Sequence, residues 1–180
     1  MRKIEIHDTG ARASLRETAL RLSFYGQIGK TWEAAMTGDV EGPDLTRIAA
    51  YKHWARDTVR YGDTDRQGHV NNAVFSTFLE TGRVSLLYDP EKPLMPKGTS
   101  FVMARLVLDF RAEIHWPNEV TIGTAVLRIG NSSVTFGQGI FVGNKCKASA
   151  ETVLVLIDDA TRKSCPLPDQ IRKDLEKWLY

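Results

Sequence analysis

The chain has 180 residues and a mass of 20.2 kDa, which corresponds to about one domain with room for a short appendage. Hydrophobic residues make up 42% and charged residues 26% of the sequence, as in ordinary globular proteins, so the composition excludes a wholly disordered chain. The 24 basic and 22 acidic side chains leave a net charge of +2 without a long run of one sign. We therefore expect neither nucleic acid nor an anionic membrane as the main partner.

The cysteines and the first residues of the chain bear on its compartment. Cys146 and Cys165 are the two cysteines, too few to form a zinc cage by themselves. The chain does not open with the basic and then apolar regions of a secretory signal. Its apolar stretches are far shorter than the ~20 residues that span a bilayer. We expect a cytoplasmic protein with two free thiols.

The first fifty residues have a helical pattern. Ser14 and Glu17 have the spacing of a capping box, which predicts the start of a helix. A narrow apolar stripe then recurs every three to four residues, at Leu15, Ala19, Leu22 and Gly26. Asp44 is expected to cap a second, short helix that reaches Tyr51. These features predict an N-terminal helical extension over residues 1–50 and a main domain over residues 51–180.

The main domain is expected to begin with a strand over residues 53–61, which is rich in β-branched and aromatic residues. The next residues, 62–68, cannot easily continue a strand or a helix and include two carboxylates. Asn71 or Asn72 is then a suitable N-cap for a helix that ends before Pro90. A carboxylate-rich loop is thus expected directly before a long helix.

One face of this helix is apolar. Its members fall at helical spacing and are Phe75, Phe78, Leu79, Gly82 and Leu86. Glu80 and Arg83 are three residues apart on the same helix, and we expect them to form a buried ion pair. The apolar face requires a partner layer, and the sequence after the helix supplies a candidate sheet.

Apolar residues occupy every second position over residues 102–114, and charged residues occupy most of the positions between them, which predicts a strand covered on one face. Three further strands are expected at residues 120–129, 134–142 and 146–157. The turns between them are so short that these strands should run antiparallel. Asp169 is expected to cap a final helix. One sheet packed on one long helix is an α+β arrangement.

Two motifs carry a family resemblance. The first is Val-Arg-Tyr-Gly-Asp-Thr-Asp-Arg-Gln-Gly-His-Val-Asn-Asn at residues 59–72, and the second is Phe-Leu-Glu-x-x-Arg at residues 78–83. With the hairpin at residues 128–136, they closely resemble the hotdog-fold acyl-CoA thioesterases of the 4-hydroxybenzoyl-CoA thioesterase type. The resemblance covers about residues 55–172. It implies a five-stranded antiparallel sheet wrapped around one long helix, homodimers or homotetramers, and active sites at the dimer interface.

Thioester hydrolysis needs a group that attacks the acyl carbon or activates water, and a positive group facing the carbonyl oxygen. The loop carboxylates and the free amides at the helix start offer both. In the family, the aspartate that matches Asp65 is the nucleophile or general base, and the amide that matches Asn72 contacts the thioester oxygen. His69 is a candidate catalytic acid, with a structural hydrogen-bond donor as the alternative.

Substrate contacts are expected in two places. Gly68 and Asn71 belong to the first motif, and Asn71 is equally suited to cap the helix. The turn at residues 130–133 resembles the place where the family holds the phosphates of coenzyme A, which makes Arg128, Ser132 and Ser133 candidate substrate-binding residues. An ordinary polar turn is the alternative. Relatives often carry more basic residues there, so either weak phosphate binding or a cation from a neighbouring subunit is expected.

The resemblance therefore predicts an acyl-CoA thioesterase that releases a carboxylic acid and free coenzyme A and needs no cofactor. No metal is expected, because the histidines lack zinc-ligand spacing. Two alternatives stay open: a thioesterase acting on acyl carrier protein, and a non-catalytic acyl-CoA-binding hotdog protein. The sequence does not predict the acyl group.

Overall fold

The computed structural model describes residues 43–91 and 94–180 of the chain. The helix predicted from Ser14 and its apolar stripe lie outside these residues. Pro43–Tyr180 is one compact unit. Residues 45–50, which the sequence pattern assigns to the N-terminal extension, pack against the sheet of this unit, and Ile48–Ala50 form a short 3₁₀ turn in place of the predicted second helix.

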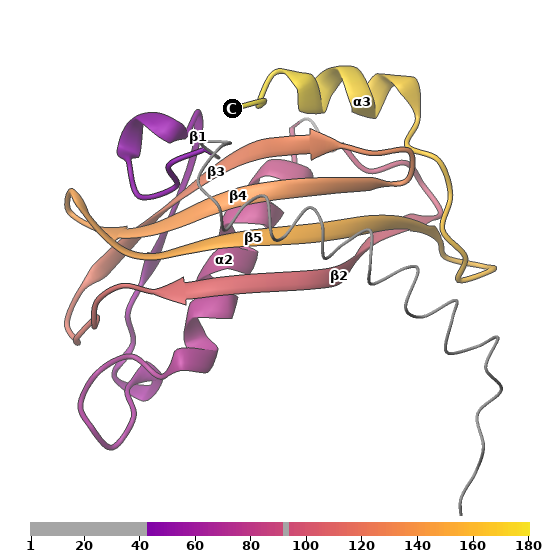
Figure 1. Cartoon of the computed structure of the whole chain (residues 1–180). Coiled ribbons are helices and arrows are strands. Elements are labelled where there is room, and N and C mark those ends of the chain that lie inside the picture. The colour runs from indigo at the N-terminus through magenta and orange to yellow at the C-terminus, as the bar shows by residue number, and fades with distance from the viewer. Residues whose placement is uncertain (1–42, 92–93) are drawn as a thin grey trace, which may run out of the picture. The chain divides into compact units, whose positions relative to one another are not determined.

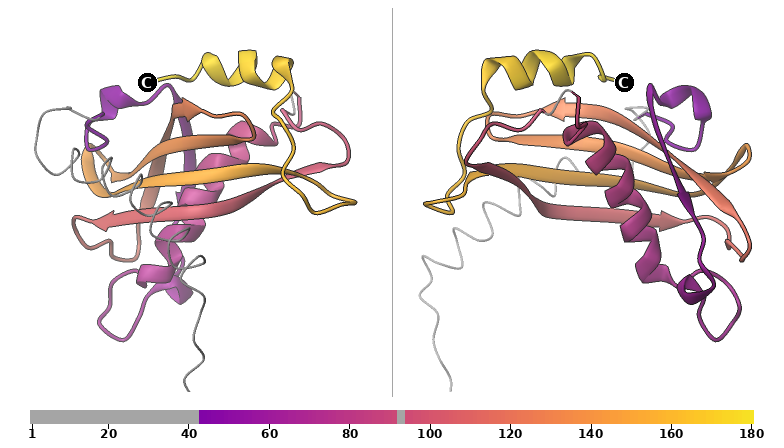
Figure 2. Two further views of the ribbon diagram at one scale, coloured as in Figure 1. Left: turned by 45° about the vertical axis from the view of Figure 1, so that its right-hand side comes forward. Right: turned by 180° about the vertical axis from the view of Figure 1, so that it is seen from behind.

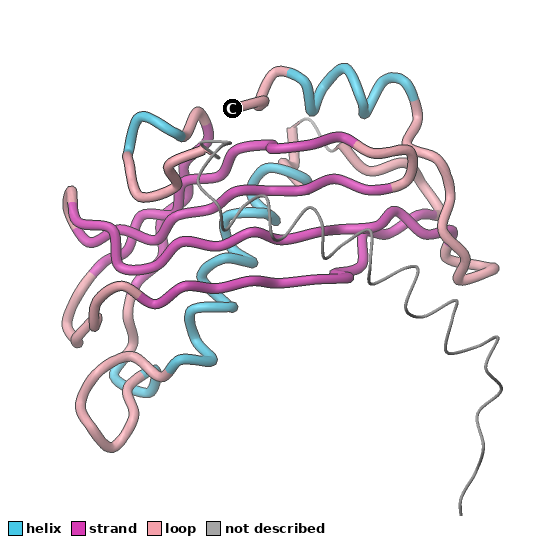
Figure 3. The backbone as a smooth tube through the Cα atoms, in the orientation of Figure 1, coloured by secondary structure: helices cyan, strands magenta, loops and turns pink. Residues whose placement is uncertain are grey.

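Five antiparallel strands form one sheet in the order β1-β3-β4-β5-β2 (Figure 1). The strands are β1 (His53–Thr58), β2 (Thr99–Phe110), β3 (Glu119–Ile129), β4 (Ser133–Val142) and β5 (Lys145–Asp158). The three strands β3, β4 and β5 have nearly the predicted bounds (Figure 3). Their antiparallel pairing is confirmed. β1 and β2 form the two edges of the sheet.

The long helix α2 (Asn72–Leu87) crosses one face of the sheet (Figure 2). All the residues of its predicted apolar face are buried, so the helix and its packing face are confirmed. The last helix, α3 (Asp169–Glu176), packs through Ile171 and Leu175 on a second part of the core. Asp169 is the first residue of α3, and the cap position predicted for it is occupied by Pro168.

Two predicted strands differ from the structure. β1 ends at Thr58, and Tyr61–Asp63 instead form a 3₁₀ turn that leads into the loop. In β2 a bulge between Met103 and Arg105 inserts Ala104, which interrupts the predicted alternation. Before the bulge, Met103 lies opposite Leu154 and faces the helix side of the sheet; after it, Leu106 lies opposite Thr152 and faces the same side. The even-numbered residues predicted to face inward therefore do so after Ala104, but before Ala104 the prediction is wrong. The strand also ends at Phe110, four residues earlier than predicted.

The outer face of the sheet is shaped by glycines. A side chain at Gly123 or Gly139 would meet the Tyr51 ring or hydroxyl within 2.6 Å, and one at Gly137 would meet Leu45 at 2.7 Å. Tyr51 is buried there, its hydroxyl donates to the Leu45 carbonyl at 2.6 Å, and burial raises its pKa. Close packing on this face therefore leaves no room for side chains at Gly137 and Gly139.

The helix α2 approaches the sheet closely at Gly82. A Cβ atom at this position would lie 2.6 Å from Cγ2 of Ile122 and 3.0 Å from Nε2 of Gln138, both in the core. Gln138 also donates from Nε2 to the Leu79 carbonyl at 2.9 Å, which ties β4 to the backbone of the helix. The helix therefore lies directly on the strands at this point.

We expect Gly82→Ala to destabilise the protein. Alanine favours a helix by about 1 kcal/mol over glycine, but overpacking of a core costs about 1–3 kcal/mol, so a net loss of up to about 2 kcal/mol is expected. Urea denaturation measures the free energy of unfolding. Thr77→Ala, at an exposed position of the same helix, is the control and should change it little. A Gly82→Ala protein more stable than the wild type would contradict the close approach.

Candidate active site

The predicted carboxylate loop connects β1 to α2 and is closed by backbone hydrogen bonds. The amide of Asp65 donates to the His69 carbonyl at 2.9 Å, and the amide of Gly68 donates to the Asp65 carbonyl at 3.0 Å. Thr64 and Val70 pair as an isolated antiparallel bridge. Gly68 has a φ of +83°, which a side chain disfavours, so the tight turn explains why glycine stands there.

The Asp65 carboxylate is held by two residues of its own loop. Oδ1 accepts the amide N–H of Gln67 at 2.8 Å, and Oδ2 lies 3.4 Å from Nδ1 of His69. The Asp65 side chain is 26% exposed and that of His69 is 20% exposed. Nε2 of His69 is 2.9 Å from Oε1 of Gln67, which fixes the imidazole from its other side. The structure thus brings Asp65, His69 and Gly68 together.

The start of α2 offers a free backbone donor. Asn71 is the N-cap: its Oδ1 accepts the amide of Ala73 at 2.9 Å. The amide of Asn72 has no hydrogen-bond partner within the described residues, and Asn72 is exposed. The amide of Asn71 donates to the Asp63 carbonyl at 2.9 Å, which fixes the helix start against the loop. A free N–H at the positive end of a helix dipole can bind an oxygen that gains negative charge.

The second aspartate of the loop has a different environment. Oδ2 of Asp63 accepts the amide of Arg60 at 2.7 Å and lies 3.7 Å from the Arg60 guanidinium. This carboxylate closes the 3₁₀ turn at Tyr61–Asp63. Its contacts are those of a turn residue.

The turn between β2 and β3 anchors the loop, and sequence reasoning missed this anchor. Nδ1 of His115 is 3.0 Å from the Gly68 carbonyl, and Nε2 is 3.2 Å from the Glu113 carboxylate. The amide of Val70 also donates to the Ile114 carbonyl at 2.7 Å. His115 and Gly68 are 47 residues apart, so no local pattern could have revealed the contact. Only the fold places them side by side.

The predicted phosphate-binding turn joins β3 to β4, at the other end of the sheet from the Asp65 loop (Figure 1). Within the described part of the chain, the amides of Asn131 and Ser132 have no hydrogen-bond partner. Ser133 places its Oγ against Gly130. Nη2 of Arg172, from α3, donates to the Asn131 carbonyl at 3.2 Å and adds a cation that the sequence pattern did not reveal.

One chain therefore does not bring all the predicted site residues together. Asp65, His69, Gly68, Asn71 and Asn72 form one group at the start of α2. The hairpin residues Arg128, Ser132 and Ser133 form a second group at the far end of the sheet.

The predicted ion pair between Glu80 and Arg83 is wrong. The guanidinium of Arg83 donates from Nη1 to Oε1 of Gln138 at 2.9 Å and to Oγ1 of Thr152 at 3.4 Å, and no carboxylate of the described residues lies within 4.0 Å of it. Burial lowers the pKa of Arg83, and the nearby Glu80 partly offsets this effect. Gln138 lies in β4 under the helix, and its side-chain oxygen accepts from Arg83 in the place predicted for the Glu80 carboxylate.

The chain matches a known protein family over most of its length. A model of the thioesterase-like superfamily matches residues 59–175, which include the Asp65 loop, α2 and all of the remaining strands. The chain belongs to this superfamily. Proteins of curated function include no match to the chain.

Solved structures of similar fold support the membership. A predicted thioesterase from Bacillus stearothermophilus is 28% identical, covers 71% of this chain and 96% of its own, and superimposes with a TM-score of 0.64. A thioesterase from Thermus thermophilus, complexed with coenzyme A and Zn, is 28% identical over 69% of this chain and 98% of its own, with a TM-score of 0.62. The fold is also shared with a 1,4-dihydroxy-2-naphthoyl-CoA thioesterase from Synechocystis. It is 19% identical, covers 68% of this chain and 94% of its own, and superimposes with a TM-score of 0.61. The predicted hotdog fold is confirmed.

Neither a metal-binding cluster nor a membrane-spanning helix occurs in the described part of this superfamily member. Among residues 43–91 and 94–180, no three or more His, Cys, Asp or Glu side chains cluster in a way that could hold a metal ion. No helix in the same part of the chain has the length and apolar character needed to cross a membrane.

Proposed function

We propose that this protein is an acyl-CoA thioesterase that hydrolyses an acyl-CoA thioester to a carboxylic acid and free coenzyme A. The observation that carries the proposal is the pairing of two opposite features at one place. The Asp65 carboxylate lies in a loop that hydrogen bonds fasten to the start of α2, where the amide of Asn72 has no partner within the described residues. The complex of the Thermus thermophilus thioesterase with coenzyme A supports the choice of thioester.

In the proposed reaction, the Asn72 amide donates to the thioester oxygen as it gains negative charge. Asp65 either takes a proton from a water molecule that adds to the acyl carbon, or adds to that carbon itself to form an anhydride that water then opens. In both routes the carbon–sulfur bond breaks and the thiolate of coenzyme A leaves and takes up a proton. A single donor of this kind typically contributes about 10²- to 10³-fold in rate. His69, beside the carboxylate, is the candidate acid.

We expect Asp65→Asn to lose most turnover while keeping the fold, because the amide is neither a base nor an effective nucleophile. A loss of about 10³-fold or more in kcat is expected. Hydrolysis is measured as the release of free thiol from a panel of acyl-CoAs. Asp63→Asn is the matched control: it lies two residues away, supports a turn and should keep most of the turnover. Near wild-type hydrolysis by Asp65→Asn would refute the assignment.

We propose that the turn between β3 and β4 binds the phosphates of coenzyme A. The free amides of Asn131 and Ser132 and the hydroxyls of Ser132 and Ser133 are donors suited to an anion. Arg128 is exposed at the end of β3, and Arg172 contacts the same turn. These features favour phosphate binding over an ordinary polar turn.

We expect Arg128→Ala to raise KM for acyl-CoA by about tenfold with little change in kcat, because the phosphates lie far from the reacting bond and one charge-assisted contact is lost. Added salt should raise the KM of the wild type more than that of the variant. Arg56→Ala, at an exposed arginine of β1, is the control. An unchanged KM in Arg128→Ala would contradict a role of this residue in phosphate binding.

We propose that the active protein is a homodimer, or a tetramer built from such dimers, in which β2 pairs with β2 of a second copy. β2 is an edge strand, and its helix side exposes Met103 by 51% and Phe110 by 50%. Val84 and Tyr88 of α2 are each 44% exposed beside it. A second copy is also needed to bring a phosphate-binding turn to an Asp65 loop, because one chain holds them at opposite ends of the sheet.

We expect the purified chain to sediment as a dimer or tetramer. Met103→Lys should shift it toward the monomer, because the charge would be buried at the seam. Lys97→Met, at an exposed position outside β2, is the control and should leave the assembly unchanged. A wild-type monomer at assay concentrations that hydrolyses acyl-CoA at full rate would contradict the proposed assembly.

A further inference from the structure

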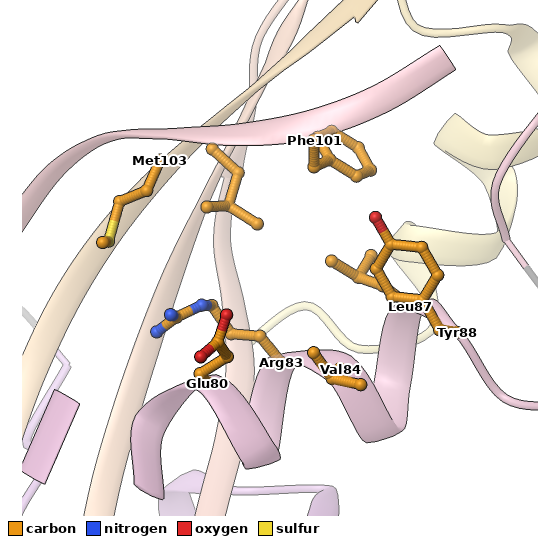
Figure 4. Close-up of a pocket in the computed structure, with 8 residues that line it drawn as sticks. Glu80, Arg83, Val84, Leu87, Tyr88, Phe101 and Met103 are labelled. Atoms are coloured by element: carbon orange, nitrogen blue, oxygen red, sulfur yellow. The ribbon is translucent and has the colours of Figure 1, made fainter. Parts of the chain in front are cut away.

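A cavity lies between the second half of α2 and the β2 edge of the sheet (Figure 4). Its volume of about 430 Å³ is within the range of roughly 300–1,000 Å³ typical of small-molecule sites. Most of its wall is apolar and consists of Val84, Leu87, Tyr88, Phe101, Met103 and Leu154. Figure 4 shows Glu80 and Arg83 side by side at one end and Tyr88 with Phe101 at the other. Apart from the Tyr88 hydroxyl, the polar groups of the cavity wall therefore lie at the Glu80–Arg83 end.

The polar end contains a buried cation. Arg83 is 6% exposed, and its Nη1 donates to neutral oxygens of Gln138 and Thr152. The Gln138 amide is locked in this orientation, because its Nε2 donates to the Leu79 carbonyl and to Oγ1 of Thr124. Burial of a charged group is costly unless its donors find partners, so a guanidinium here needs further acceptors.

The remaining donors of Arg83 are available to the cavity. A guanidinium has five N–H groups, and only Nη1 has a partner within the described residues. No buried side-chain nitrogen or oxygen in this part of the chain lacks a partner, so Nε and Nη2 of Arg83 keep accessible surface. Since Arg83 lines the cavity, these donors meet whatever fills it.

We propose that this cavity receives the far part of the acyl group and that Arg83 selects acyl groups carrying a neutral oxygen, such as a hydroxyl or keto group, over unsubstituted chains. This inference names the substrate class and rests on the thioesterase function proposed above. The apolar wall binds the hydrocarbon part, and the oxygen accepts the free N–H groups of Arg83.

Glu80 explains why the oxygen should be neutral. Its carboxylate lies at the same end of the cavity and interacts electrostatically with Arg83, without forming an ion pair. A hydroxyl group can accept from Arg83 and donate to Glu80. A carboxylate at the end of the acyl chain would instead place a second negative charge beside Glu80. The pair thus favours neutral oxygen over a terminal carboxylate.

The test compares acyl-CoAs of one chain length. Asn72 and Arg83 are eleven residues apart, which is about 16 Å along the helix, so the position of the oxygen along the acyl chain must be varied. The series consists of dodecanoyl-CoA and its forms hydroxylated beside the thioester, at mid-chain and at the chain end. A form that ends in a carboxylate completes the series. We expect one hydroxylated form to exceed dodecanoyl-CoA by about 10- to 100-fold in kcat/KM, the value of a hydrogen bond to a charged group.

Two variants and one control assign the preference to its residues. Arg83→Met keeps an unbranched side chain without donors and should lower kcat/KM for the hydroxylated form to the value for dodecanoyl-CoA, which removes the preference. Val84→Ala enlarges the same cavity without touching the donors and should change both substrates by a similar factor. Glu80→Gln changes an exposed residue and should raise kcat/KM for the carboxylate-ended chain relative to dodecanoyl-CoA. Circular dichroism confirms that each variant is folded.

The outcomes separate the two proposals. Hydrolysis without any preference for an oxygenated chain, or an equal loss on both substrates in a folded Arg83→Met, overturns the inference and leaves the thioesterase function intact. If Arg83→Met does not fold, an unchanged ratio in Glu80→Gln overturns it instead. If no acyl-CoA is hydrolysed, the proposed function fails, and calorimetric titration of the wild type with the same series decides the inference: equal Kd values for oxygenated and plain chains would overturn it.

Discussion

The close contact between α2 and the sheet is the constraint on which the rest of the structure depends. Gly82 has no side chain where the helix meets Ile122, and Gln138 donates from β4 to a backbone carbonyl of the helix. This contact fixes both the position and the direction of the helix. The free amide at its first residue therefore lies at the Asp65 loop, and Arg83 is held between the strands and the cavity.

The candidate catalytic groups are held mainly by backbone hydrogen bonds and by a distant turn. Asp65 and Gly68 close the loop on themselves, while His115 and Ile114 hold it from the turn between β2 and β3. A carboxylate that must stay close to a reacting carbon benefits from such fixed geometry. The turn proposed to bind phosphate lies at the far end of the sheet from the Asp65 loop, which is why we propose that two chains pair to complete the site.

Much of the fold was predictable because it repeats a local rule. The apolar face of α2 follows directly from the period of a helix, and the bounds of β3, β4 and β5 follow from runs of β-branched and apolar residues that short turns separate. The bulge at Ala104 was not predictable, because both registers of that strand contain apolar residues and the pairing with β5 decides which register faces the helix. Likewise, spacing permitted a Glu80–Arg83 pair, but the choice depended on Gln138, 55 residues further along.

The sequence by itself determined the order and type of the elements and the place of the Asp65 motif between a strand and a helix, because these depend on residues close together in the chain. Only the tertiary structure decided that His115 holds the motif, that Arg172 joins the β3–β4 turn, and that Arg83 faces a cavity. Such contacts join residues far apart in sequence, and their partners are chosen by packing, which no local pattern encodes.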